Sequence, residues 1–313
     1  MSIVVTGGLG FIGSNLIKTL LLRSEEKIIV LDNFSTGRIE NLHPFEDSER
    51  ILVKRVDLRD FEKLKEVLCE DVIAVFHFAA NPEVRVGNPK EHFEHNILVT
   101  YNLLEAMRTK DIKNIVFASS STVYGEAKKL PTPEDYGPLR PISVYGASKL
   151  ACEALISSYT HTYDFTGVTL RYANVVGPNP TRGVVKDFVE KLKKNPHELE
   201  ILGDGKQTKS YVWIEDAVNG TLIAWEKIKS GFEEFNIGSP DAVSVTRIAE
   251  IVVEEMGLKN VKFKYTGGVK GGRGWLGDVK YMHLDIRKLM NLGWSPKYNS
   301  EETIRKGVRS LIH

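Results

Sequence analysis

A tyrosine and a lysine spaced four residues apart are the strongest candidates for chemistry in this sequence: Tyr145 and Lys149, within Tyr-Gly-Ala-Ser-Lys. On a helix, side chains at this spacing share one face, with Cβ atoms roughly 5–6 Å apart. A phenol has a reference pKa of about 10 and is a poor base at neutral pH, but a neighbouring ammonium group favours the phenolate. Tyr145 can then accept a hydroxyl proton while hydride leaves the same carbon atom. The same spacing also arises by chance on many helices.

A run of serines supplies a third candidate group. Ser119, Ser120 and Ser121 follow a β-branched segment at residues 114–118 that is typical of a strand. A hydroxyl at the end of this strand can hydrogen-bond the reacting oxygen and orient it, although three serines could equally form an ordinary loop. The joint occurrence of all three features predicts an enzyme that removes a proton and a hydride from one substrate carbon, with Ser120, Tyr145 and Lys149 as its catalytic residues.

Glycines after the first predicted strand form a Gly-x-x-Gly-x-x-Gly pattern: Gly7, Gly10 and Gly13. A glycine turn lets the backbone approach a pyrophosphate closely, and a helix starting near Phe11 would direct its N-terminal dipole at that group. Glycine triplets are often simple turns. Here a strand precedes the glycines and a helix follows them, which favours a dinucleotide site.

An aspartate ends the second predicted strand, in Leu31-Asp32-Asn33. An acidic residue about 20 residues beyond the glycines can bind the adenosine ribose hydroxyls. Its charge would repel a 2′-phosphate, so the sequence favours NAD over NADP. The alternative is that Asp32 is only a turn residue at the end of a strand.

The elements that must position these groups alternate along the first 170 residues. Strands are predicted at 3–6, 27–31, 51–56, 72–77, 114–118 and 166–170, and helices at 11–22, 61–68, 91–107 and 145–162. Repetition of strand and helix predicts an α/β fold with a doubly wound parallel sheet, because such crossovers are almost always right-handed. The carboxyl ends of parallel strands are where ligands bind in such sheets.

The pattern changes after about residue 174, where loop sequence at 177–183 precedes a predicted helix at 184–194 and an apolar run at 199–202. We therefore expect residues 1–173 to form the NAD-binding domain, with segments near 207–239 returning to it. Residues 174–313 would mainly form a smaller α/β lobe that binds substrate.

The composition argues against several other classes of protein. Lysine and arginine total 42 against 41 acidic residues, which gives no sign of a nucleic-acid binder. Two cysteines, Cys69 and Cys152, are too few for a disulfide framework or a metal cluster, and we expect buried thiols. No signal peptide or membrane span is expected, so a cytoplasmic location is the default.

As a set, these features resemble the extended short-chain dehydrogenase/reductase family, and most closely its nucleotide-sugar branch, typified by UDP-glucose 4-epimerase. The motifs that carry the resemblance are TGGLGFIG at 6–13, LDN at 31–33, DL at 57–58, HFAA at 77–80, ASSSTVYG at 118–125, YGASK at 145–149, RYANVVGP at 171–178, GDGKQTKSYVWIEDA at 203–217, FNIGS at 235–239 and LGWSP from residue 292. They run the length of the chain in the family's order. The resemblance implies a Rossmann sheet, bound NAD, a UDP-hexose substrate and a homodimer formed through the helices near 91–107 and 145–162, whose apolar faces could otherwise serve only the sheet.

The resemblance also assigns residues. Those implied to contact NAD are Gly7, Gly10, Phe11, Ile12, Asp32, Asn33, Asp57, Leu58, Ala79, Ala80, Asn96, Ser119, Tyr145, Lys149 and Tyr172. Those implied to contact the nucleotide sugar are Ser120, its alternate Ser121, Tyr145, Asn174, Val185, Lys209, Arg273 and Asp278.

Departures from the family pattern bear on the reaction and the substrate. Related 4,6-dehydratases resemble Thr-Asp-Glu where this chain has Ser120-Ser121-Thr122, so no carboxylate is present to eliminate water. Lys209 stands where the family usually has arginine, and Arg273 lies two residues before the family's arginine position, where it could reach a diphosphate or be a solvated loop charge.

The resemblance therefore implies interconversion of UDP-glucose and UDP-galactose by transient oxidation at C4. The alternatives are another epimerase or reductase of the family, acting on UDP-N-acetylhexosamines, GDP-sugars or dTDP-sugars, and a non-catalytic NAD-binding protein. Proteins of the last class commonly lose the tyrosine or lysine, and both are present here.

Overall fold

The computed structural model describes residues 1–68, 71–85 and 87–312. Cys69 lies outside these residues. The large sheet is built from β1 (Ser2–Thr6), β2 (Lys27–Asp32), β3 (Ile51–Arg55), β4 (Val72–His77), β5 (Asn114–Ser120), β6 (Thr166–Tyr172) and β11 (Gly231–Ile237). Around it lie α1 (Phe11–Arg23), η1 (Ile39–Leu42), α2 (Phe61–Val67), α3 (Pro89–His92), η2 (Phe93–Leu98), α4 (Val99–Thr109), η3 (Ser121–Tyr124), α5 (Val144–Tyr163), α7 (Ile214–Lys227) and α9 (Arg287–Met290).

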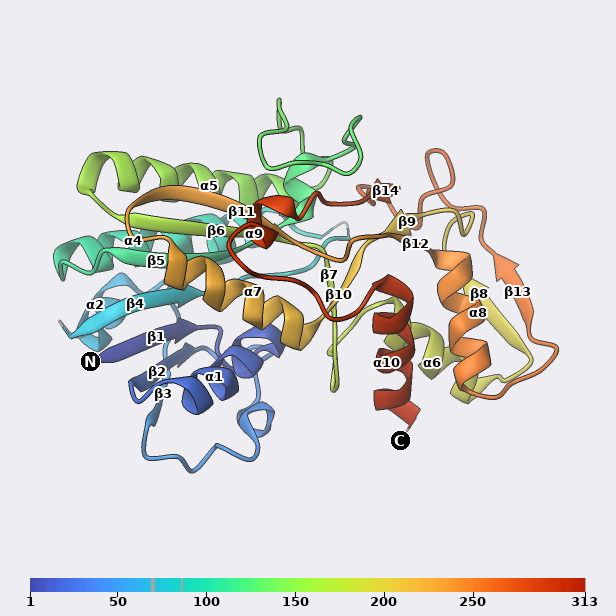
Figure 1. Ribbon diagram of the computed structural model, residues 1–313, viewed down its shortest axis with the longest axis horizontal. Helices are drawn as coiled ribbons and strands as arrows, with labels where there is room; N and C mark the ends of the chain where they lie inside the picture. The colour runs from blue at the N-terminus through green and yellow to red at the C-terminus, as the bar shows by residue number, and fades with distance from the viewer. Residues whose placement is uncertain (69–70, 86, 313) are drawn as a thin grey trace.

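The seven strands lie in the order β11-β6-β5-β4-β1-β2-β3, and every pair is parallel. The order runs outward in both directions from β1, which confirms the predicted doubly wound α/β fold (Figure 1). Because β1 and β4 lie side by side where the winding reverses, the loops after them meet at the point where open sheets bind ligands.

Helices cover both faces of this sheet. Successive residues of β1 point to opposite sides, so Ile3 and Val5 pack with α1 and α7, whereas Val4 packs with α2, α4 and α5. Figure 1 shows α4 and α5 on one side of the sheet and α1 and α7 on the other. Burial on both faces accounts for the nearly continuous apolar strands of the sequence.

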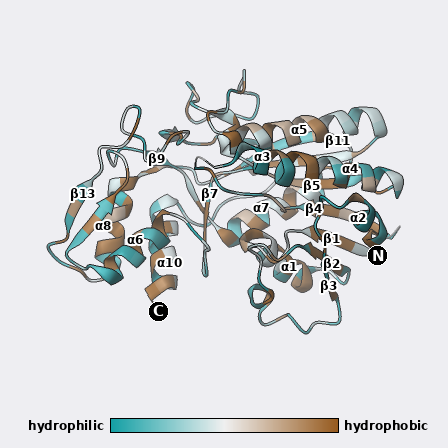
Figure 2. Cartoon of the chain, turned by 180° about the vertical axis from the view of Figure 1, so that it is seen from behind, coloured by the Kyte–Doolittle hydropathy of each residue, from teal (hydrophilic) through white to brown (hydrophobic). Residues whose placement is uncertain are grey.

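The C-terminal part forms a smaller lobe with its own apolar core. Its elements are β7 (Asn174–Val176), α6 (Val184–Lys194), β8 (Glu198–Ile201), β9 (Thr208–Lys209), β10 (Tyr211–Trp213), β12 (Val243–Ser244), α8 (Val245–Glu255), β13 (Lys262–Tyr265), β14 (Tyr281–Met282) and α10 (Ser300–Ile312). Helix α6 buries Val185, Phe188, Val189 and Leu192, the spacing of an amphipathic helix. Figure 2 shows both hydrophobic and hydrophilic residues along α6 and α8. In the described residues, none of the helices combines the length and hydropathy needed for a membrane span.

The predicted helix at 91–107 is longer than expected and contains an irregular turn. It begins at Pro89, behind the side-chain cap of Asn88, and continues through α3, η2 and α4. The middle segment η2 is a π-helix, a rare form that often occurs at functional sites. This segment places Asn96 inside the molecule, with 2% of its surface exposed.

Candidate active site

The glycine turn between β1 and α1 is closely packed against the end of β4. Gly7 has φ +63°, and a Cβ atom there would lie 2.6 Å from the backbone nitrogen of Ala79. At Gly13, a Cβ atom would lie 2.6 Å from the carbonyl oxygen of Gly7. Helix α1 has no side-chain cap and no acidic residue in its first turn, where Phe11 and Ile12 are half-buried. Its N-terminus therefore keeps the positive potential that suits a pyrophosphate.

Asp32 is more than a turn residue. Its carboxylate accepts hydrogen bonds from the backbone of Leu9, at 3.1 Å, and of Phe34, at 2.9 Å. The first bond ties the end of β2 to the glycine turn and holds the carboxylate beside it. Each oxygen has further acceptor capacity for a ribose hydroxyl. The neighbouring Asn33 is half-buried, and its side chain accepts from the backbone of Ser35.

The segment after β3 brings two more predicted cofactor residues to the same edge of the sheet. Asp57 forms a two-oxygen ion pair with Arg59, whose hydrogen bonds lower the pKa of the aspartate. Leu58 is buried, and its carbonyl oxygen accepts from the Asn102 side chain of α4 at 3.0 Å. These bonds fix the loop between β3 and α2.

A buried histidine supports the loop after β4. His77 lies between the hydroxyl groups of Thr6, at 2.7 Å, and Thr100, at 3.0 Å. Burial, together with the charge of Lys149, lowers its pKa to about 3, so the ring is neutral at physiological pH. The hydroxyl of Thr6 also accepts from the backbone of Ala79, at 3.3 Å. This chain of bonds orients Ala79 and the adjacent Ala80, both half-buried.

The side chain of Asn96 is used to join neighbouring segments. Its amide oxygen accepts from the backbone of Asn81 at 2.7 Å, and its amide nitrogen donates to the Ser148 hydroxyl at 2.8 Å. The residue thus connects the loop after β4 to α5. Its contact with NAD stays a prediction.

Helix α5 brings the predicted catalytic residues together. Ser143 caps its N-terminus by accepting from the backbone of Gly146 at 3.0 Å. Lys149 is buried, its Nζ atom donates to the carbonyl oxygen of Ala118 at 2.8 Å, and it lies 5.9 Å from the centre of the Tyr145 ring. Ser120 ends β5, its hydroxyl accepts from the Thr122 side chain at 3.0 Å, and it lowers the pKa of the nearby Tyr145 hydroxyl. The three groups therefore meet at the carboxyl end of β5.

Burial and the neighbouring groups act in opposite directions on the pKa values of Tyr145 and Lys149. Burial raises the pKa of Tyr145, while the charge of Arg182 and the hydrogen bond with Ser120 lower it. Burial lowers the pKa of Lys149 to about 8, against the influence of Cys152 and Glu153. Cys152 is itself a buried, unpaired thiol, as expected from the sequence.

The other predicted residues of this region have partners within the protein. The Ser119 hydroxyl donates to Glu153 at 2.5 Å, and Ser121 is buried in η3. The hydroxyl of Tyr172 lies 2.5 Å from that of Thr221 in α7. Their contacts with cofactor or substrate stay predictions.

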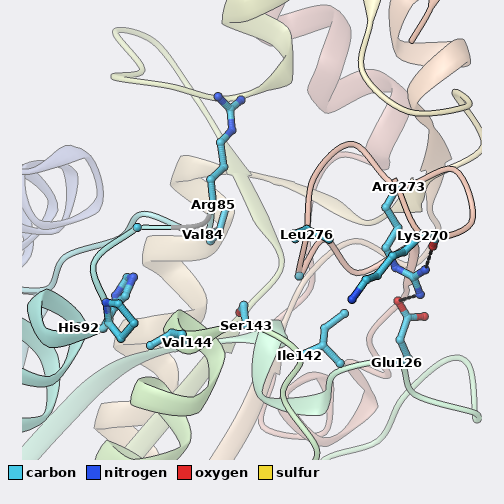
Figure 3. A pocket seen from close by; sticks show the side chains of 13 residues that line it. Val84, Arg85, His92, Glu126, Ile142, Ser143, Val144, Lys270, Arg273 and Leu276 are labelled. Carbon is cyan, nitrogen blue, oxygen red and sulfur yellow. Dashed lines mark hydrogen bonds and ion pairs between the residues drawn. The ribbon is translucent and has the colours of Figure 1, made fainter. Parts of the chain in front are cut away.

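A cavity of about 460 Å³ opens at the start of α5, and its lining includes His92, whose ring packs against Tyr145, but none of the three predicted catalytic residues. The residues that line it are Val84, Arg85, Gly87, Pro89, His92, Glu126, Ile142, Ser143, Val144, Lys270, Arg273, Leu276 and Gly277. Figure 3 shows Arg85 and His92 on one side, and Lys270 and Arg273 on the other. The sequence left two roles open for Arg273, a diphosphate ligand or a solvated loop charge. In the structure it lines the cavity and also pairs with Glu126 at 2.8 Å, and its contact with a diphosphate stays a prediction.

The predicted substrate residues of the smaller lobe are only partly accessible. The Nζ atom of Lys209 lies 2.5 Å from Oδ1 of Asp278, whose side chain is 2% exposed. The same Nζ atom lies 5.3 Å from the centre of the Trp275 ring. Asn174 donates to the carbonyl oxygen of Ser210 at 3.2 Å. Val185 packs in the core of this lobe.

Sequence reasoning missed two groups near the catalytic pair. The ring of His92 lies 6.1 Å from that of Tyr145 at an edge-to-face angle. Glu153 and Arg171 form an ion pair at 2.8 Å with side chains 5% and 4% exposed. A signal for this pair was present, because Glu153 follows Lys149 by four residues and Arg171 interrupts a buried strand.

Together, the fold and this site define an NAD-binding α/β enzyme with a tyrosine–lysine pair. Comparison with known proteins goes further: residues 3–238 match the profile of the NAD dependent epimerase/dehydratase family. The chain belongs to this family, and is an extended short-chain dehydrogenase/reductase similar to UDP-glucose 4-epimerase.

Individual relatives agree over nearly the full length. A putative UDP-glucose 4-epimerase of Methanocaldococcus jannaschii is 36% identical over 315 residues, covering 98% of this chain and 97% of the relative. A crystal structure of a UDP-galactose 4-epimerase is 42% identical with a TM-score of 0.88, covering 100% and 99%. A UDP-N-acetylglucosamine 4-epimerase of Methanobrevibacter ruminantium is 30% identical with a TM-score of 0.87, covering 99% and 98%. The chain is an NAD-dependent nucleotide-sugar 4-epimerase.

Proposed function

We propose that this epimerase interconverts UDP-glucose and UDP-galactose. The observation that carries the proposal is the assembly of Ser120, Tyr145 and Lys149 at the end of β5, with no carboxylate in the Ser120-Ser121-Thr122 segment. Such a site can oxidise and reduce C4 but lacks the acid group that elimination of water would need. The UDP-glucose and UDP-galactose 4-epimerases among its relatives support the same choice of substrate.

The roles of the catalytic residues follow from their geometry. Tyr145 removes the proton of the C4 hydroxyl and returns it after the keto sugar has turned in the cavity. Ser120 hydrogen-bonds the reacting oxygen, and the ammonium of Lys149 favours the phenolate of Tyr145. NAD, when bound, would supply the hydride acceptor for this oxidation at C4.

The residues present fit NAD. The glycine turn has no room for side chains, α1 has an uncapped N-terminus, and Asp32 holds its carboxylate beside them. We assign the pyrophosphate to Gly7, Gly10, Phe11 and Ile12, and the adenosine ribose to Asp32 and Asn33. Asp57, Leu58, Ala79 and Ala80 form the adjoining wall. Asn96 and Ser119 hold this wall in place through their bonds to neighbouring segments.

An assay without added cofactor tests the proposed function. The purified protein is incubated with UDP-galactose, and formation of UDP-glucose is followed. We expect product, because an enzyme that returns its hydride in every cycle needs no external NAD. No product, even with NAD supplied, would contradict the choice of UDP-hexose. Parallel incubations with UDP-N-acetylglucosamine and dTDP-glucose would then identify the preferred sugar nucleotide.

We also propose that two copies pair through α5 and the helix formed by α3, η2 and α4. Phe93 and Tyr101 of this helix are 55% and 46% exposed, which leaves aromatic surface without cover in a single chain. Sedimentation of the purified protein is expected to show a dimer. A monomer at micromolar concentration would contradict the pairing.

A further inference from the structure

A buried charged network lies directly behind the catalytic pair. The Glu153 carboxylate accepts hydrogen bonds from the Ser119 hydroxyl at 2.5 Å and from the Arg171 guanidinium at 2.8 Å. Arg171 also donates to the Tyr124 hydroxyl at 3.0 Å, which in turn donates to Asn236 at 2.8 Å. Burying a charge pair is costly unless its remaining bonds are satisfied, and here they are. The network therefore has a fixed geometry.

This network sets how α5 meets the end of β5. The carbonyl oxygen of Ala118 accepts from Lys149, and the hydroxyl of the next residue, Ser119, donates to Glu153. Lys149 and Glu153 are separated by one helical turn and hold two successive residues of the strand. The next residue of the strand is Ser120, which lowers the pKa of Tyr145, so the anchor formed by Glu153 fixes the backbone that carries the Ser120 hydroxyl.

The same carboxylate supplies negative charge to the buried Lys149. The titratable groups that act on this ammonium are Cys152 and Glu153 of α5 and His77 of β4. Burial raises the pKa of the Cys152 thiol, so it is neutral at physiological pH, and His77 is neutral as well. Glu153 is thus the acidic side chain among these groups, and its carboxylate is held by Ser119 and Arg171.

We propose that Glu153, held in place by Arg171, is a positioning residue that fixes β5 against α5 and keeps Lys149 protonated. This inference rests on the proposed roles of Tyr145 and Lys149. It assigns to the ion pair a part in the reaction beyond stabilising the fold.

The test is the pH profile of kcat in a Glu153→Gln variant loaded with NAD. Glutamine keeps the size of the side chain and removes its charge, so the pKa of Lys149 should fall below about 8. Lys149 then loses its proton at lower pH, and the alkaline limb of the profile moves to lower pH by about one unit. Near pH 8 the loss in kcat is about fivefold, while KM stays within about twofold of the unchanged protein.

A matched control separates this role from the loss of a carboxylate on a helix. Glu105 of α4 accepts from the Tyr159 hydroxyl of α5 at 2.6 Å, away from Lys149, and Glu105→Gln should leave the profile in place. A Glu153→Gln/Arg171→Gln double variant leaves no unpaired buried cation and should show the same shift. If the profiles of the single and double variants superimpose on that of the unchanged protein, the proposal is wrong.

A second readout does not depend on turnover. The ultraviolet absorbance of the Tyr145 phenolate, taken as the difference from Tyr145→Phe, is titrated with and without Glu153→Gln. We expect tyrosine ionisation at higher pH in the variant, because the supporting ammonium is lost earlier. An unchanged titration would overturn the proposal even if no sugar nucleotide were converted, whereas failure to convert any of them counts only against the proposed function.

Discussion

Replacing Tyr145 by phenylalanine should lower kcat for epimerisation by about 10³-fold, the middle of the range for general acid–base catalysis. The change removes a single oxygen atom, the one that hydrogen-bonds Ser120. The ring remains and keeps its packing against His92. Bound NAD should therefore be retained, and the melting temperature should change little.

The measurement is kcat with UDP-galactose, together with the NAD content of the purified variant. Tyr281→Phe is the matched control, since that tyrosine is 46% exposed in β14 and removing its hydroxyl should leave kcat unchanged. If Tyr145→Phe retained near-normal kcat, the assignment of the acid–base group would be incorrect. A variant that lost NAD would instead show that the hydroxyl group has a structural role.

The second large effect is expected at Gly7→Ala. A methyl group there would lie 2.6 Å from the backbone nitrogen of Ala79, and the residue has φ +63°. The backbone must move, which would disturb both the pyrophosphate turn and the end of β4. We expect a loss of about 3–5 kcal/mol in the free energy of unfolding and purification without NAD.

Gly257→Ala distinguishes crowding from backbone strain. Gly257 has nearly the same conformation, φ +65°, but has no other atom within 4 Å of the Cβ position. Its substitution should cost only about 1–2 kcal/mol, the penalty of a left-handed residue. Chemical denaturation measures both variants. Equal losses would mean that the tight contact with Ala79 is unimportant.

The large sheet was predictable because its signals are local. The strand at 72–77 and the helix at 184–194 were placed at their observed bounds from apolar patterning alone. The pairing of Tyr145 with Lys149 followed from their spacing on one helix, and Ser120 was predicted at the end of the neighbouring strand. In contrast, the two-residue strands β9, β12 and β14 depend on partners distant in sequence, and no local pattern indicates them.

The site was harder to predict where a side chain has a choice of partner. Lys209 has the charge expected of a phosphate ligand, yet the structure pairs it with Asp278. Val185 lies in the expected helix but on its buried face. The π-helix η2, which contains Asn96, has no recognisable signal in the sequence, because its extra residue per turn is imposed by packing rather than by composition.

The cavity at the start of α5 is walled by two kinds of structure, and this bears on how such an enzyme could diversify. The groups assigned to oxidation and reduction stand on the large sheet and on α5, whereas the opposite wall, with Lys270, Arg273 and Leu276, comes from a loop between β13 and β14. Loops tolerate insertion and substitution better than the elements they connect. Selection could therefore exchange one sugar for another by altering this loop, while the inherited redox chemistry remained under separate and stricter constraint.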